Sequence, residues 1–265
     1  MRDTPQFPGI HPTATVDRKA ELGEVVTVGP GAFVGPDVVL GDGCTVGANA
    51  VLEGPSVFGP GNSIGAMCHL GGDPQDLKYM GGDTRLLVGE GNDFRSFCTV
   101  NRGTEHGGRV TRIGDGCLLM HYTHVAHDCT LDDGAVLANS AQLGGYVHVA
   151  SEAIVAALVG VHQFVHVGRL AMIAAGSMAD KDVPPFTIVQ GDRARLVGLN
   201  VVGLRRAGVS VASRTALKDA YRELFRRGGV MLERVTALEQ DSDDPLVTEL
   251  ATFVRGSTRG ICVGR

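Results

Sequence analysis

The sequence predicts a mainly β protein, a parallel β-helix followed by a small helical subdomain, on three observations. An apolar residue recurs at every sixth position through most of the chain, and a small residue usually stands two positions before it. Glycine is abundant at 38 residues, while aromatic residues make up 5% and tryptophan is absent. This composition is unlike an ordinary globular core and indicates many tight turns around small side chains.

The six-residue period runs from Ile10 to Leu70, restarts from Val88 to Val100, and then continues from Ile113 to Ile173. In a short strand, residues i and i−2 point to the same face, so the apolar residue and the small residue should both point inward. The remaining residues, rich in Gly, Asn and Asp, make the turn. Stacked strand-and-turn units form a β-helix, in which each coil buries its interior against its neighbours.

Two insertions interrupt the period, GGDPQDLKYMGGDTRLL (71–87) and RGTEHGGRV (102–110). In a solenoid, insertions emerge as loops on one side and often form the binding face. We therefore expect residues 1–190 to form one β-helical domain whose two loops lie beside a functional site.

The period ends after KDVPPFTIVQG (181–191), where a pair of prolines marks a boundary. In residues 213–229 the apolar side chains fall on one helical stripe that a pair of glycines stops, which predicts a helix. Two more helices are expected over Val230 to Glu239 and Pro245 to Arg255. Residues 191–265 should therefore form a small C-terminal helical subdomain.

Six cysteines are present, and no two of them have CxxC spacing. Five fall on the small inward position, namely Cys44, Cys68, Cys98, Cys117 and Cys129. These are expected to pack in the core and not to bind metal or pair as disulfides. No charged segment followed by an apolar run opens the chain, and no stretch approaches the roughly 20 apolar residues of a membrane span. We expect a cytoplasmic protein with no integral membrane segment.

The stretch HYTHVAHDCT (121–130) places His121, His124 and His127 three residues apart, with Asp128 directly after the last. His121 and His127 are six apart, so the β-helix turns them onto neighbouring faces and they cannot hold one ion within a subunit. A zinc site would need a cleft shared between subunits, and we expect no metal. Asp128 could fix the tautomer of His127 and make it a general base, while solvated turn residues are the alternative.

Eight motifs occur together, in order and at characteristic intervals. They are PQDLKY (74–79), NRGT (101–104), THVAHDCT (123–130), AVLANSAQLGGYV (135–147), VGVHQF (159–164), DVPPF (182–186), VGLNVVGLRR (197–206) and STRG (257–260). Over nearly the whole chain the sequence resembles the UDP-N-acetylglucosamine O-acyltransferases of lipid A synthesis, a branch of the hexapeptide-repeat acyltransferases. The resemblance implies a left-handed β-helix of triangular section, a handedness that is an exception to the usual right-handed crossover rule.

The resemblance also implies an activity and its catalytic residues. An (R)-3-hydroxyacyl chain would pass from acyl carrier protein to the 3-position of UDP-N-acetylglucosamine, the first step of lipid A biosynthesis, without a cofactor. His127 would be the general base, Asp128 its partner, and the N–H of Gly145 the donor to the oxyanion. The residue types agree, because a hydroxyl is a weak nucleophile that needs a base, and a glycine amide can approach the oxyanion closely.

For substrate binding, the resemblance assigns three groups of residues. These are Gln75, Asp76 and Lys78 in the first loop, His124, His162 and Gln163 in the same cleft, and Asn200 and Arg206 at the nucleotide end. Lys78 and Arg206 suit a pyrophosphate, which requires cations. Ala175 stands where the family has a glycine at the end of the acyl-binding groove, and its methyl group is expected to shorten the accepted chain.

Besides Ala175, the sequence departs from the family at four positions. Asn101 and Tyr146 replace histidines that contact substrate, Val202 replaces an acidic residue near the nucleoside, and Ala207 replaces the second arginine of a pair. The motifs therefore determine the identity of the acceptor sugar less closely than the identity of the general base. Three alternatives stay open. They are acyl transfer to a 3-amino UDP-sugar analogue, an acetyl-CoA-dependent hexapeptide sugar acetyltransferase, and a non-catalytic β-helical scaffold.

The distribution of charge and the flat faces of the predicted prism indicate which macromolecules the protein binds. The net charge is −5, yet residues 193–227 are basic: Arg193, Arg195, Arg205, Arg206, Arg214, Lys218, Arg222, Arg226 and Arg227 stand against Asp219 and Glu223. This patch suits docking of the acidic acyl carrier protein, and it lacks the interleaved aromatics of a nucleic-acid surface.

Because a cleft on a flat prism face needs a second wall, we expect a homotrimer whose sites each draw on two subunits.

Overall fold

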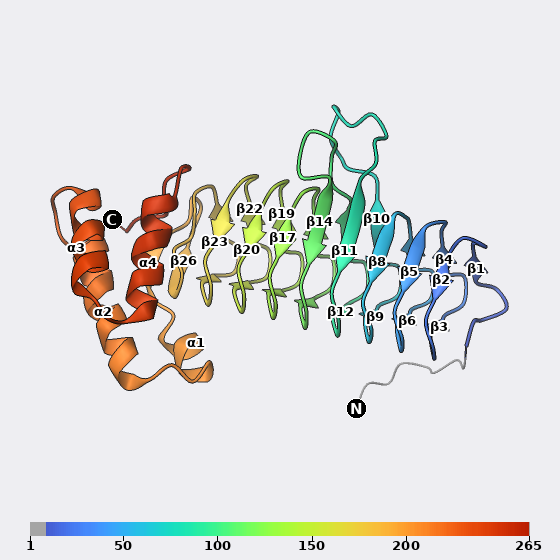
Figure 1. Ribbon diagram of the computed structural model, residues 1–265, viewed down its shortest axis with the longest axis horizontal. Coiled ribbons are helices and arrows are strands. Elements are labelled where there is room, and N and C mark those ends of the chain that lie inside the picture. The colour runs from blue at the N-terminus through green and yellow to red at the C-terminus, as the bar shows by residue number, and fades with distance from the viewer. Residues whose placement is uncertain (1–8, 265) are drawn as a thin grey trace.

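The computed structural model describes residues 9–264. They form an elongated β-helix that ends in a group of helices (Figure 1). Twenty-seven short strands of this region fall into three sheets. The sheets are the walls of the β-helix, so the section of the coil has three sides.

The first sheet has the order β1 (Thr15–Val16), β4 (Phe33–Val34), β7 (Val51–Leu52), β10 (His69–Gly72), β13 (Thr99–Asn101), β16 (His124–Val125), β19 (Gln142–Leu143), β22 (Gly160–Val161) and β25 (Met178–Ala179). The second has the order β2 (Glu21–Leu22), β5 (Val38–Leu40), β8 (Ser56–Phe58), β11 (Arg85–Val88), β14 (Val110–Ile113), β17 (Thr130–Leu131), β20 (His148–Val149) and β23 (His166–Val167). The third has the order β27 (Arg195–Leu199), β26 (Thr187–Gln190), β24 (Met172–Ile173), β21 (Ile154–Val155), β18 (Val136–Leu137), β15 (Leu118–Leu119), β12 (Asp93–Phe94), β9 (Ser63–Ile64), β6 (Thr45–Val46) and β3 (Thr27–Val28).

Apart from β26 and β27, strands that are neighbours in a sheet are one full coil apart in the chain and pair in parallel. His124 lies opposite Gln142, and Gln142 lies opposite Gly160. This register repeats along the regular part of each wall, so equivalent residues of successive coils lie directly over one another. The fold class predicted from the six-residue period is confirmed.

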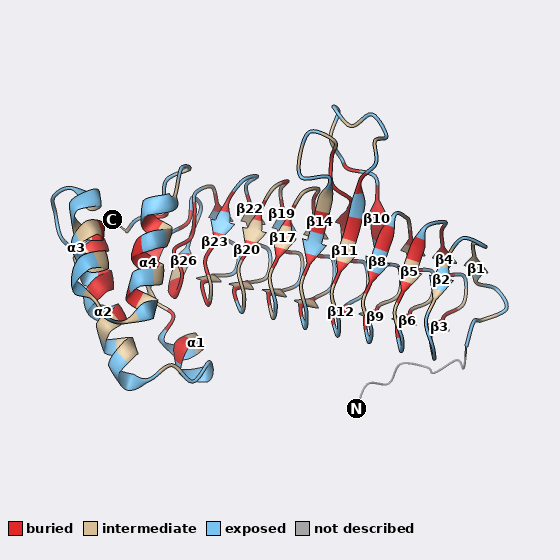
Figure 2. Cartoon of the chain, viewed as in Figure 1, coloured by how far each residue is buried: buried red, intermediate tan, exposed pale blue. Residues whose placement is uncertain are grey.

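The inside of the coil is built from the two positions that the period singles out. Val125, Leu143 and Val161 follow one another up the first sheet with 0%, 1% and 4% of their surface exposed, and the small residues Ala141 and Ala153 are fully buried. In Figure 2 the buried positions recur along every coil. Each coil alternates a large inward side chain with a small one, so successive layers fill the triangular interior without large voids.

The five inward cysteines pack as predicted, and Cys262 near the C-terminus is buried as well. Burial raises the pKa of Cys129 to about 12 and that of Cys117 to about 11. The Cys129 thiol donates a hydrogen bond to the backbone oxygen of Gly144 at 3.1 Å. The Cys117 and Cys129 thiols therefore stay protonated at neutral pH, which suits packing and not metal binding.

Both insertions leave the β-helix at the corner between the first and second sheets and project on the same side (Figure 1). They are shorter than expected, because residues 71–72 complete β10, residues 85–87 belong to β11, and residue 110 begins β14. Hydrogen bonds join the loops to each other, from the Met80 N–H to Oε1 of Glu105 at 3.0 Å and between His106 Nε2 and Asp76 Oδ2, also at 3.0 Å.

The strands continue past residue 190, because β27 pairs antiparallel with β26 and extends the third sheet. Four helices follow: α1 (Val201–Arg206), α2 (Val211–Arg226), α3 (Met231–Asp241) and α4 (Pro245–Gly256). The three expected helices are present; α1 was not expected, since one and a half turns carry no periodic signal. Leu217, Leu224 and Leu250 pack with Leu170 and Phe186 of the β-helix end in a second hydrophobic cluster.

No helix in the described part of the chain is both long and apolar enough to cross a membrane.

Candidate active site

Two adjacent side chains meet at the corner between β16 and β17. Asp128 is the second residue of this turn and adopts a φ of 58°, in the left-handed region. A strand would point His127 and Asp128 to opposite faces, but the turn brings them together, with Nδ1 of His127 2.9 Å from Oδ2 of Asp128. Only 12% of the His127 side chain and 2% of the Asp128 side chain are exposed.

Thr104, from the second loop, holds the Asp128 carboxylate. Its backbone N–H lies 3.1 Å from each carboxylate oxygen, and its hydroxyl donates to Oδ2 at 2.7 Å. On the other side, the Asp128 N–H donates to Oγ1 of Thr111 at 2.8 Å. Burial opposes ionisation of Asp128, but the hydrogen bonds from His127 and Thr104 outweigh it and lower the pKa of this carboxyl.

An ionised Asp128 can only accept hydrogen bonds, so the contact to His127 requires a proton on Nδ1. The neutral ring then has its lone pair on Nε2. This is the arrangement of a general base whose tautomer a carboxylate fixes.

Gly145 lies one coil above His127, as the 18-residue register requires. A Cβ at residue 145 would lie 2.6 Å from Cε1 and 2.8 Å from Nε2 of His127, so only glycine fits. The Gly145 carbonyl accepts from the Phe164 N–H at 3.0 Å, while its own N–H has no hydrogen-bond partner in residues 9–264. A free amide thus stands beside the basic nitrogen, where it could donate to an oxyanion.

Tyr146 packs on the outer side of this pair. Its ring meets the His127 ring edge-on at a centroid distance of 5.3 Å and stacks on Phe164 at 4.5 Å. Its hydroxyl lies 3.3 Å from Oγ1 of Thr104. The residue that departs from the family pattern therefore touches both the histidine and the threonine that holds Asp128.

A cleft of about 820 Å³ opens along the outer face of the first sheet beside these residues. It is lined by Gln75, His124, His127, Gly145, His162 and Gln163, with Met178, Asp180, Asp192, Arg193 and Arg259 at its other end. The structure thus brings together six of the residues that the sequence assigned to the site, from three successive coils and the first loop.

Burial, and secondarily the nearby His127, lower the pKa of His124, so its ring is neutral at physiological pH. Its Nδ1 lies 2.8 Å from Oγ1 of Thr99. His124 is therefore positioned to exchange hydrogen bonds with a ligand without adding charge.

Two residues of the site were missed as functional residues at the sequence level. Thr104 holds Asp128, and Arg259 reaches back from the end of the chain to place Nη2 2.7 Å from Nδ1 of His162. Each belongs to a quoted motif, NRGT and STRG, which was the available signal. Neither motif states which of its side chains faces the cleft.

Asp128 contacts His127 but does not itself line the cleft. Five other assigned residues do not line it either: Asp76, Lys78, Ala175, Asn200 and Arg206. Asp76 is bound to His106 in the neighbouring loop, and Lys78, Ala175 and Arg206 are exposed elsewhere. Asn200 is buried as the N-cap of α1, where its side chain accepts from the Gly203 N–H at 3.0 Å and donates to the Leu170 carbonyl at 2.9 Å. Within one chain, Asn200 therefore stabilises a helix end.

His121 lies at a different corner from His127, before β16 and not after it, and is exposed. In residues 9–264 no group of three His, Cys, Asp or Glu side chains is placed to hold a metal ion.

Two protein-family models match the chain. Residues 182–262 match the second domain of UDP-N-acetylglucosamine O-acyltransferase, and residues 19–54 and 111–145 match the bacterial transferase hexapeptide repeat. One model thus matches the C-terminal part of the chain, and the other matches two stretches of the β-helix.

Relatives that match over nearly their whole length are also named UDP-N-acetylglucosamine O-acyltransferases. The chain is 50% identical over 255 residues to the acyl-(acyl-carrier-protein)–UDP-N-acetylglucosamine O-acyltransferase of Alkalilimnicola ehrlichii, covering 95% of this chain and 98% of that protein. It is 45% identical to the protein of the same name from Sulfurovum sp., covering 95% and 96%. Its structure is similar to UDP-N-acetylglucosamine acyltransferase from Campylobacter jejuni, with a TM-score of 0.93 and 34% identity over 97% of this chain and 100% of that one. This match supports the left-handed winding.

Gly145→Ala should displace the His127 ring, because the added methyl group has no room beside Cε1 and Nε2. We expect acyltransfer turnover to fall on the order of 100-fold, as for a misplacement of about 1 Å at a reacting group. Steady-state kinetics would measure this. Gly198→Ala, at a site where a Cβ meets nothing within 4 Å, is the control and should retain its rate. An active Gly145→Ala enzyme would contradict the close approach.

Proposed function

The chain belongs to the UDP-N-acetylglucosamine O-acyltransferase family and transfers an acyl chain from acyl carrier protein to UDP-N-acetylglucosamine, and from this premise we propose how its residues carry out the transfer. The group moved is an (R)-3-hydroxyacyl chain, and the acceptor atom is the sugar 3-hydroxyl. The observation that carries the proposal is the cluster of His127, Asp128 and the Gly145 N–H at one edge of one cleft.

In this mechanism, Nε2 of His127 takes the proton of the sugar hydroxyl as its oxygen attacks the thioester carbonyl. The ionised Asp128 stabilises the imidazolium that forms, and the Gly145 N–H donates to the oxyanion of the tetrahedral intermediate. When the intermediate collapses, the C–S bond breaks and the imidazolium returns its proton to the departing thiolate. No cofactor is needed, since the ester forms at the expense of the thioester.

Thr104 and Tyr146 act through Asp128 and His127 in this proposal. Thr104 donates twice to the carboxylate and so keeps it ionised and oriented. Tyr146 limits the rotation of the His127 ring by packing against it edge-on. Both are positioning residues.

For the acceptor, we assign Gln75, His124, His162 and Gln163 to the sugar and the phosphate-proximal part of the cleft. Arg193 and Arg259 are the cations that line the same cleft. Asn200 and Arg206 do not line it in their own chain, so we propose that they serve the cleft of a neighbouring subunit. The relatives do not favour a 3-amino sugar or acetyl-CoA as substrate.

A homotrimer is proposed because one corner of the β-helix carries an exposed apolar stripe. Met67, Phe97, Tyr122 and Leu158 lie at the turns that enter β10, β13, β16 and β22 of the first sheet, with 50%, 41%, 56% and 65% of their surface exposed, and Ser140 holds the equivalent position before β19. Phe97 and Tyr122 stack on each other at 4.7 Å. A row of apolar side chains at a prism edge suits burial against another subunit, which would also supply a second wall to the cleft.

Docking of acyl carrier protein is proposed on the basic segment 193–227, where charges of opposite sign would steer the acidic partner. We place the reaction in the cytoplasm. The six cysteines are free and none is paired, which agrees with a reducing compartment.

His127→Ala should lower turnover by roughly 10² to 10⁴-fold, because the sugar hydroxyl loses its base. Mass spectrometry of products from (R)-3-hydroxyacyl carrier protein and UDP-N-acetylglucosamine would measure it. Asp128→Asn should also reduce turnover.

His121→Ala is the matched control, since this histidine lies at another corner and outside the cleft. It should retain most of the activity, and both variants should keep the thermal stability of the parent. Equal losses at His121 and His127 would refute the assignment. Offering the 3-amino analogue beside UDP-N-acetylglucosamine tests the acceptor, because preferential formation of an amide would show that the substrate is the amino sugar.

Leu158→Glu should weaken the trimer, because it places a charge in the apolar stripe. Light scattering coupled to size-exclusion chromatography should show a concentration-dependent shift toward smaller species and a parallel loss of activity. Val25→Glu is the control: Val25 is 84% exposed, has a similar left-handed φ of 57°, and lies at a corner outside the stripe. If both variants remain trimeric, the stripe is not the interface.

A further inference from the structure

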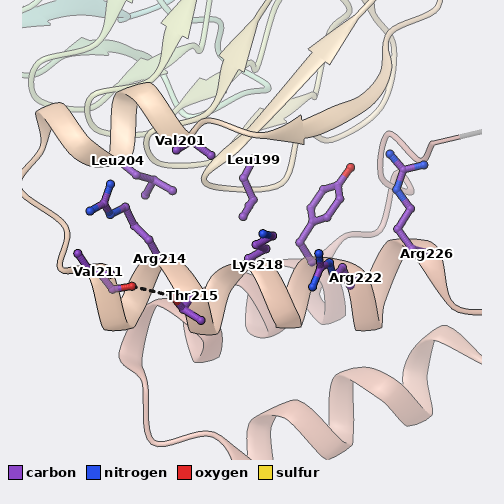
Figure 3. Close-up of a pocket in the computed structure, with 10 residues that line it drawn as sticks. Leu199, Val201, Leu204, Val211, Arg214, Thr215, Lys218, Arg222 and Arg226 are labelled. Atoms are coloured by element: carbon purple, nitrogen blue, oxygen red, sulfur yellow. Dashed lines mark hydrogen bonds between the residues drawn. The ribbon is translucent and has the colours of Figure 1, made fainter.

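A second cavity, of about 560 Å³, lies between the end of the β-helix and α2, away from the His127–Asp128 pair. Figure 3 shows this groove, in which side chains of α2 rise toward Leu199, Val201 and Leu204. The remaining lining residues are Val211, Arg214, Thr215, Lys218, Tyr221, Arg222 and Arg226. None of these residues lines the cleft beside His127.

The floor of this groove is apolar. Leu204 is fully buried and Leu199 is partly covered, while Val201 and Val211 expose 54% and 71% of their surface at the mouth. Aliphatic side chains gathered in a concavity of this size are typical of a site for a small apolar group.

Four cations line one side of the groove: Arg214, Lys218, Arg222 and Arg226. They are four residues apart, so they form a single row on one face of α2 (Figure 3). Like charges at this spacing destabilise a helix, and no carboxylate lines the groove to compensate them. Arg222 has a long ion pair with Asp219 at 3.5 Å, whereas Lys218 and Arg226 have no ion-pair partner in residues 9–264.

Tyr221 provides an independent observation. Only 7% of this residue is exposed, and its buried hydroxyl has no hydrogen-bond partner in the described chain. The ring is fixed by the edge of Phe225 at a centroid distance of 5.2 Å, and the Arg226 guanidinium lies 5.8 Å from its centroid. A buried hydroxyl without a partner is costly, and here it stands in the wall of a groove beside unpaired cations.

We propose that this groove binds a single-chain fatty acid. The chain lies on Leu199, Leu204, Val201 and Val211, and the carboxylate lies between Lys218 and Arg226, where it accepts a hydrogen bond from the Tyr221 hydroxyl. A carboxylate satisfies the two unpaired cations and the orphan hydroxyl together, which a neutral apolar ligand does not. The site is separate from the acyltransfer cleft, and its binding does not depend on the proposed catalytic mechanism.

Equilibrium dialysis of radiolabelled dodecanoate, below its micellar concentration and without acyl carrier protein or sugar nucleotide, tests this proposal. We expect one molecule bound per chain, and dodecan-1-ol, which lacks the charge, should bind at least tenfold more weakly. Tyr221→Phe should weaken dodecanoate binding about five- to tenfold, and Lys218→Ala with Arg226→Ala should weaken it further.

Arg227→Ala is the charge-matched control, since Arg227 is exposed at the end of α2, pairs with Glu223 and does not line the groove. It should bind dodecanoate like the parent. Tyr221→Phe should also unfold at the same or a higher temperature, because the hydroxyl it removes has no partner in the chain. The proposal is overturned if the parent protein binds no dodecanoate, if dodecanol binds equally well, or if Tyr221→Phe and Lys218→Ala bind as the parent does.

Discussion

The register of the coil is the constraint on which the rest of the structure depends. Each coil alternates large and small inward side chains, and parallel pairing holds residues 18 apart directly over one another. A one-residue slip would send every inward side chain outward, so the packed interior fixes the register strongly. His127, Gly145 and Gln163 occupy equivalent positions of successive coils for this reason. The candidate active site is therefore a consequence of core packing.

The turns at the corners of the coil place the reactive groups of the candidate active site. A left-handed residue at the second turn position lets Asp128 reach its own neighbour His127, and the second loop adds Thr104 to hold the carboxylate. Because no side chain intervenes at Gly145, its free amide and the basic nitrogen border the same space. The base and its orienting carboxylate come from one turn and the oxyanion donor from the equivalent turn of the next coil, and the register of the backbone sets the distance between the two turns.

The sequence predicted those parts that follow from period and motif. The inward positions, including five cysteines, and the separation of His121 from His127 both follow from counting in sixes. The resemblance supplied the residues of the cleft. What could not be predicted depends on how non-repeating segments fold back. Thr104 reaches Asp128 only because the second loop closes over the corner. Arg259 reaches His162 only because the chain end returns to the β-helix. Asn200 was assigned to a ligand, yet within its own chain it caps α1, since capping depends on a helix too short to predict.

The tautomer of His127 decides whether this residue can act as the general base, because Asp128 can orient the ring only if the proton is on Nδ1. Selective ¹⁵N-labelling of histidine and NMR of the resting protein at neutral pH would report it. We expect a protonated Nδ1 and an unprotonated Nε2 for the histidine whose resonances disappear in the His127→Ala variant. A proton on Nε2 in the neutral ring would contradict it, since that nitrogen could not then take the proton of the sugar hydroxyl.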